Sequence, residues 1–146
     1  MKSILYVVGI SFALFVSSAN ADVVARCGAL EGYTFVLEGP LVKKEDSGWE
    51  HGGVTGGSTS IIFLDNRFDI IFSDTTGTTR SARADGAEIH LLGLNKGNGT
   101  ILLLVDYEGD TAEIWTYSPA TNQLFLLHQT YGGMFNKSRV LVSDCH

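Results

Sequence analysis

Short apolar runs separated by turn residues recur along the chain, and the clearest example lies in residues 100–118. Residues 101–105 are all apolar, a run too short for a buried helix and of the right length for a strand. Residues 111–118 are rich in β-branched and aromatic side chains, and Gly109 supplies the positive φ that the intervening turn requires. The pattern predicts a β-hairpin whose first strand, apolar on both faces, is central or covered rather than an edge.

The same alternation of apolar runs and turns extends over most of the chain. Residues 60–73 predict a second hairpin that turns at Asp65 and Asn66, and further strands are expected near residues 33–37, 78–82, 87–94, 123–131 and 139–143. Turn signals recur every eight to twelve residues, and no helical periodicity competes with them. The sequence therefore predicts an all-β fold, an antiparallel meander of about eight or nine strands, either a small up-and-down barrel or a β-sandwich.

Residues 38–60 interrupt this pattern with many glycines around Trp49 and His51. We expect a long loop there, with a short helix at residues 41–46 as an option. A loop of this length in a compact domain is typical of a functional segment.

The first 21 residues have the three parts of a secretory signal peptide: Lys2, an apolar stretch at residues 4–16, and the small-residue motif ending at Ala21. We expect cleavage there and a single β domain over residues 22–146. Cys27 lies several residues beyond the cleavage point, so no lipid-anchored or otherwise stable membrane attachment is expected. The predicted address is periplasmic or secreted.

Cys27 and Cys145 are the two cysteines of the chain and nearly bracket the predicted domain. In an oxidising compartment they are expected to form a disulfide. Free thiols, or a metal site that includes His146, are the alternatives, but the paired spacing of a zinc site is missing. We expect no metal and no cofactor.

The charge balance limits the partners, because 16 acidic residues against 10 basic ones give a net charge of −6. An acidic chain without a basic patch is poorly suited to nucleic acid.

Motifs for catalysis are absent or incomplete. Asp74-Thr75-Thr76-Gly77 differs by one inserted residue from the aspartic-protease motif, so an ordinary turn is the better interpretation. His90 and His128 lie in predicted strands without a recognisable partner, and no nucleophile, base and orienting group can be named together. An enzyme is therefore the least favoured class. Asn98 and Asn136 each begin a glycosylation sequon, whose use depends on the host.

The chain resembles a group of small proteins without assigned activity that are exported by Gram-negative bacteria. The resemblance is carried by Cys27-Gly28, Gly32-Tyr33, Gly48-Trp49, residues 68–74 with Gly77, Ala84-Asp85-Gly86 and the late Cys145. It implies a periplasmic or secreted address and no particular chemistry.

These observations favour a non-enzymatic envelope or secreted binding protein that meets a basic protein partner through residues 38–60. The candidate binding residues are Trp49, His51, Arg80, Arg83 and Tyr131. The second hypothesis is a carrier of a small apolar ligand inside a β-barrel lined by Phe68, Ile70, Phe72, Leu103 and Trp115, although the same residues would fill a solid core. Strands apolar on both faces also leave a homodimer open.

Overall fold

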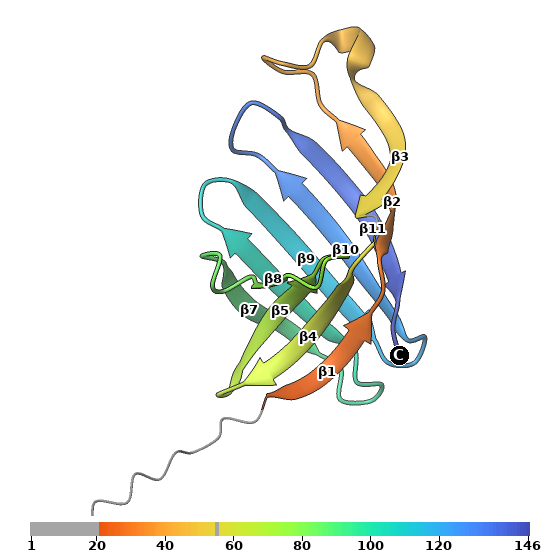
Figure 1. The fold of residues 1–146 in the computed structure, drawn as a ribbon, viewed down its shortest axis with the longest axis vertical. Coiled ribbons are helices and arrows are strands. Elements are labelled where there is room, and N and C mark those ends of the chain that lie inside the picture. Colours follow the sequence, from red (N-terminus) through yellow and green to blue (C-terminus); the bar gives the residue numbers. More distant parts are fainter. Residues whose placement is uncertain (1–20, 55) are drawn as a thin grey trace, which may run out of the picture.

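A computed structural model describes residues 21–54 and 56–146 and contains eleven strands and one short 3-10 turn in this part of the chain (Figure 1). The strands are β1 (Asp22–Cys27), β2 (Leu30–Val36), β3 (Gly48–Val54), β4 (Ser58–Leu64), β5 (Arg67–Ser73), β6 (Thr79–Ser81), β7 (Glu88–Leu94), β8 (Ile101–Tyr107), β9 (Thr111–Ser118), β10 (Gln123–Thr130) and β11 (Lys137–Asp144). The 3-10 turn covers Lys44–Asp46.

The strands form two antiparallel sheets, a smaller one in the order β1-β4-β5-β6 and a larger one in the order β3-β2-β11-β10-β9-β8-β7. The predicted all-β class is confirmed, and the arrangement is that of a β-sandwich. The barrel alternative is wrong. A barrel needs every edge strand to be paired, whereas β1, β6, β3 and β7 each end a sheet here.

The core lies between the two sheets. Its largest fully buried side chains include Trp115 and Leu103 from the larger sheet and Ile61 and Ile70 from the smaller one. Phe72 of β5 packs on Trp115 with ring centroids 5.9 Å apart. Burying one such side chain stabilises the fold by roughly 1.5–3 kcal/mol. Ile70, Leu103 and Trp115 thus lie inside the sandwich core, while Phe68 and Phe72 are partly buried at its border.

The hairpin expected at residues 100–118 is confirmed as β8 and β9. Gly109 has a φ of 76° in the turn, as the sequence predicted. The buried positions of β8 alternate with half-buried ones, so Leu103 and Val105 face the core while Leu104 points to the outer face of the larger sheet. The β4–β5 hairpin also turns where expected, with positive φ at Asp65 and Asn66.

The prediction of a long loop at residues 38–60 is wrong for most of that segment. Gly48–Val54 forms β3, which pairs with β2 along its whole length, and the expected helix is reduced to the 3-10 turn. The glycines serve the pairing, since a Cβ on Gly53 would lie 2.3 Å from the carbonyl oxygen of Leu30. Residues that allow backbones to approach closely were mistaken for loop residues. This strand and β1 account for the excess over eight or nine strands.

The disulfide between Cys27 and Cys145 is confirmed and spans 118 positions of sequence. Cys27 ends β1 in the smaller sheet, and Cys145 follows β11 of the larger sheet. The bond therefore ties the two sheets together, and it rules out free thiols or a thiolate metal site at these residues.

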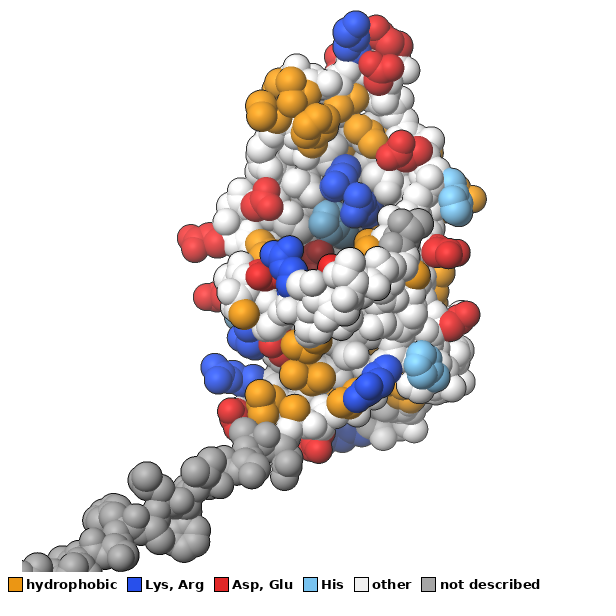
Figure 2. All heavy atoms as spheres, viewed as in Figure 1, with side chains coloured by type: hydrophobic (Ala, Val, Ile, Leu, Met, Phe, Trp, Pro, Cys, Tyr) orange, Lys and Arg blue, Asp and Glu red, His pale blue; other side chains and the backbone are white. Residues whose placement is uncertain are grey.

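The larger sheet extends beyond the smaller one on the side where β2 and β3 rise (Figure 1). Its inner face consequently has a covered half, which carries the core, and an open half. In Figure 2 the surface is hollowed at this boundary, where basic side chains and a histidine gather.

The predicted leader, residues 1–21, lies outside the described residues apart from Ala21. No helix in the described part is long and apolar enough to cross a membrane.

Candidate functional site

A row of polar side chains crosses the inner face of the larger sheet where the cover by the smaller sheet ends. Antiparallel pairing places Glu113 of β9 beside His128 of β10, His128 beside Arg139 of β11, Arg139 beside Thr34 of β2, and Thr34 beside Glu50 of β3. Side chains on adjacent strands at one register share a face and lie about 5 Å apart. The five therefore form one continuous polar row.

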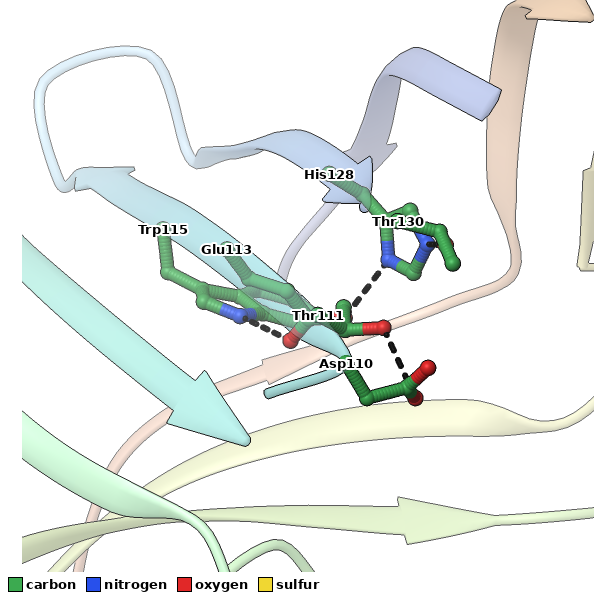
Figure 3. Close-up of polar contacts among 6 residues, drawn as sticks. All are labelled: Asp110, Thr111, Glu113, Trp115, His128 and Thr130. Carbon is green, nitrogen blue, oxygen red and sulfur yellow. Dashed lines mark hydrogen bonds and ion pairs between the residues drawn. The ribbon is translucent and has the colours of Figure 1, made fainter. Parts of the chain in front are cut away.

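Glu113 and His128 are the centre of a hydrogen-bond network (Figure 3). Trp115 Nε1 donates to Glu113 Oε2 at 2.9 Å, and His128 Nδ1 lies 2.8 Å from Glu113 Oε1. His128 Nε2 lies 3.0 Å from Thr130 Oγ1. The side chains of His128 and Glu113 are only 15% and 9% exposed, so this contact is largely buried rather than at the surface.

An ionised Glu113 accepts hydrogen bonds and donates none, so the ring nitrogen that faces it carries a proton. In the neutral imidazole the other ring nitrogen, Nε2, then accepts from the hydroxyl of Thr130. The order carboxylate, imidazole, hydroxyl resembles the activation of a nucleophile in hydrolases. His128 and Thr130 are, however, alternate residues of one strand, whose side chains share a face in any strand. Strand geometry alone explains their contact, and the network fixes the orientation of the imidazole.

Two cavities open on either side of this network, and Phe72, Glu113 and His128 line both. The first has a volume of about 280 Å³ and extends between the sheets along Trp115 and Leu141. The second, about 410 Å³, is lined by Tyr107, Asp110, Arg80 and Asp85. The imidazole thus stands between an apolar space and a polar one.

Tyr107 lies at the polar cavity, and burial raises its pKa to about 12. The negative charges of Glu113 and Asp85 add to this effect, while Arg80 acts against it. The phenol therefore stays protonated over the physiological range, where it can donate a hydrogen bond.

Lys137 and Arg139 are inward-facing residues of β11 that lack an ionic partner among the described residues. Arg139 Nε is buried and has no hydrogen-bond partner in residues 21–54 and 56–146. Burial, and then the positive charge of Arg139, lower the pKa of Lys137, while Glu50 acts in the opposite direction. Two neighbouring cations in a partly desolvated position favour the binding of a negatively charged ligand.

The predicted binding residues Trp49 and His51 lie on β3, and their register places them on the outer face of the larger sheet. Each packs against an aromatic ring of β2: Trp49 against Phe35 with centroids 5.2 Å apart, and His51 against Tyr33 at 5.4 Å. Both pairs are edge-to-face. These two residues are therefore brought together, though on a strand rather than on a loop.

The other predicted binding residues do not join them. Arg80 pairs with Asp85 at 2.9 Å. Arg83 donates from Nε to the carbonyl of Phe68 at 2.7 Å and from an Nη to that of Ile89 at 3.0 Å, so it links the two sheets structurally. Tyr131 is exposed in the segment between β10 and β11.

The Asp74 motif is a turn, as the sequence indicated. Asp74 Oδ1 accepts from the hydroxyl and the amide of Thr76 and from the amide of Thr78, at 2.7–2.9 Å. These bonds, the Thr76 hydroxyl first, lower the pKa of Asp74.

Sequence reasoning missed Glu113 and Arg139, and the expectation that His128 lacks a recognisable partner is wrong, because Glu113 lies 2.8 Å from its Nδ1. A signal was present, because His128 continues the inward positions of Leu124 and Leu126, and Glu113 shares the inward face with Trp115. Polar residues at inward positions of strands mark buried networks.

Comparisons with protein-family models, curated proteins and solved structures find no match to this chain.

Proposed function

We propose that the protein is a non-enzymatic interaction module of the bacterial envelope or of the secreted fraction, which binds a basic protein partner. The surface is the outer face of the larger sheet, including Trp49 and His51. It replaces the loop that the sequence suggested.

The observation that carries the proposal is the apolar character of this uncovered face. Its outward positions include Trp49 at 64%, Tyr33 at 56%, Val140 and Leu127 at 49% each, and Phe125 at 42% exposure. The face runs across adjacent strands in register, and a shallow groove of about 280 Å³ lies over Ile114, Leu127 and Val140. Contiguous apolar surface of this kind marks interaction sites.

The two aromatic pairs give the face rigid anchors. Phe35 holds Trp49, and Tyr33 holds His51, in edge-to-face contact before any partner arrives. Aromatic residues fixed in this way dominate binding energy because little side-chain entropy remains to be lost.

The charge on the face selects the partner. The outward positions of the larger sheet carry four carboxylates, Glu31, Glu88, Asp106 and Asp144, and none of these described positions holds Lys or Arg. A partner with an apolar centre and a basic rim matches this distribution. A second copy would set carboxylates against carboxylates, which disfavours a homodimer through this face.

The cysteine pairing supports the proposed address. A disulfide that ties two sheets together needs an oxidising compartment, as the periplasm and the exterior provide.

The experiment compares three forms of residues 22–146: the native sequence, Trp49→Ser, and the control Val23→Ser. Val23 is also exposed and apolar, but it lies on the smaller sheet. Each form is used to capture proteins from an envelope extract of a Gram-negative bacterium at low and at high salt. The best-captured protein is then titrated by calorimetry.

We expect the proteins that the native form and the Val23 control retain, and that Trp49→Ser loses, to be basic and to dissociate in high salt. Affinity of the purified partner should fall at least about tenfold in Trp49→Ser, as for a central aromatic anchor. Equal loss in both variants, or retention of acidic proteins only, refutes the proposal. A Trp49-dependent dimer in sedimentation velocity would assign the face to a second copy instead.

A further inference from the structure

We propose that the cavity between the sheets binds a small amphipathic carboxylate, with Arg139 receiving the carboxylate group, Lys137 adding positive charge next to the cavity, and the apolar end of the cavity receiving the body of the molecule. The site lies on the inner face of the larger sheet, opposite the proposed protein-binding face. The proposed ligand site can therefore be tested independently of the proposed protein-binding face.

At the polar end of the cavity, the guanidinium of Arg139 offers hydrogen-bond donors that no described residue accepts. Arg139 lines the cavity, its Nε is buried without a partner, and its guanidinium forms no ion pair with another described residue. Lys137, next but one along β11, faces the same side of the sheet. Burial and then the positive charge of Arg139 lower the pKa of Lys137. A bound carboxylate would pair with Arg139, because the fork of a guanidinium matches a carboxylate with two parallel hydrogen bonds, and Lys137 outside the cavity lining would add positive charge.

The other end of the cavity is apolar. Leu30, Phe72, Trp115, Leu126 and Leu141 line it, and Trp115 is fully buried. An apolar pocket with a few convergent polar groups is the usual form of a small-molecule site. The arginine at one end of the cavity and the apolar side chains at the other therefore favour an amphipathic ligand.

The neighbouring carboxylates restrict the charge of the ligand. Glu113 and Asp74 line the cavity, and Glu50 lies outside it at the far end of the polar row. A dianion such as phosphate would meet repulsion from them and would leave the apolar end unfilled. At about 280 Å³ the cavity is also at the small end of ligand sites, which suits a short monocarboxylate rather than a long lipid.

Octanoate is the probe, and Trp115 is the reporter. The chain has two tryptophans, so Trp49→Phe leaves Trp115 as the one fluorophore of its kind, at the wall of the cavity. We expect octanoate to change Trp115 fluorescence saturably and to release heat in calorimetry. Octan-1-ol has the same apolar body and no charge. It should bind at least about tenfold more weakly, because it lacks one charge-assisted hydrogen bond to the arginine.

Variants in the same Trp49→Phe background locate the carboxylate. Arg139→Gln should raise the Kd for octanoate at least about tenfold, whereas Arg139→Lys, which keeps the charge, should raise it less. Arg26→Gln is the matched control, because it removes an exposed arginine from the smaller sheet. Circular dichroism and the thermal midpoint establish that each variant is folded. Equal affinity for octanoate and octanol, equal Kd values in Arg139→Gln and Arg26→Gln, or no saturable response to octanoate overturns the proposal.

Discussion

The hydrogen-bond network of Glu113 allows a quantitative test of why a carboxylate is buried in this sandwich. Glu113 accepts from Trp115 Nε1 at 2.9 Å and faces His128 Nδ1 at 2.8 Å. Replacing Glu113 by Leu leaves the indole N–H without an acceptor and His128 Nδ1 without a partner. A buried donor left unsatisfied costs about 1–3 kcal/mol. With about 2 kcal/mol for the indole and about 1 kcal/mol for the imidazole, which keeps some contact with water, we expect Glu113→Leu to lower the free energy of unfolding by about 3 kcal/mol.

Glu113→Gln is the matched variant, because it has the same shape and satisfies both neighbours. Its amide oxygen accepts from Trp115, and its amide nitrogen donates to His128 once the ring proton moves to Nε2, which then donates to Thr130. We expect a loss of about 1 kcal/mol, and thus a difference of about 2 kcal/mol between the two variants.

Urea unfolding followed by tryptophan fluorescence, with equal m values, measures this difference. For a domain of this size it corresponds to a separation of roughly 8 °C between the thermal midpoints. The double variant Glu113→Leu/His128→Leu should lose less than the sum of its single changes, since one unsatisfied group is removed with its partner. If Glu113→Leu is as stable as Glu113→Gln, the carboxylate is not required as an acceptor, and the reasoning fails.

Two further predictions concern the disulfide and the buried phenol. The double variant Cys27→Ser/Cys145→Ser opens a loop of 118 positions and should destabilise the domain by about 5 kcal/mol in the chain-entropy model. The native sequence with its disulfide reduced should unfold at the same urea concentration as this variant. A loss of stability below about 1 kcal/mol would contradict the model. In an absorbance titration one tyrosine should ionise near pH 12, and Tyr107→Phe should remove that step. Because the pKa of Tyr107 in the fold lies above its ordinary value of about 10, its contribution to stability is complete below pH 10 and is lost as the pH rises toward 12. If the step near pH 12 persists in Tyr107→Phe, the assignment is wrong.

Alternation and turn chemistry were sufficient to predict the fold class. The strands β8 and β9 were expected because apolar runs of strand length flank a glycine that can adopt positive φ. The disulfide followed from the position of two cysteines. These features are local, or depend on so few residues that no alternative pairing exists.

The strand β3 and the choice between barrel and sandwich could not be predicted. Gly53 looks like a loop residue unless it is known that the backbone of β2 passes close beside it. Likewise, β1 and β2 are nearly continuous in sequence, and nothing in Gly28 or Ala29 reveals that the chain changes sheets there.

The candidate site was even harder to predict from the sequence, because it depends on the register of paired strands. Glu113, His128 and Arg139 come from three strands, and only the pairing of those strands sets them in one row. Trp49 and His51 could be named from the sequence as candidate binding residues, but their place on a strand and their partners Phe35 and Tyr33 follow from the pairing of β2 with β3.

The pairing of β2 with β11 has a consequence for the order of folding. Strands β7 to β11 form a meander of neighbours along the chain, which local contacts can assemble rapidly. Val36 of β2, in contrast, pairs with Lys137 of β11, roughly 100 positions later. The β2–β3 pair therefore has no other neighbour in the larger sheet until β11 has been made. Closure across this long interval is the slow step that topology imposes, and a chain threaded through a membrane from its N-terminus would complete it only after β11 had crossed.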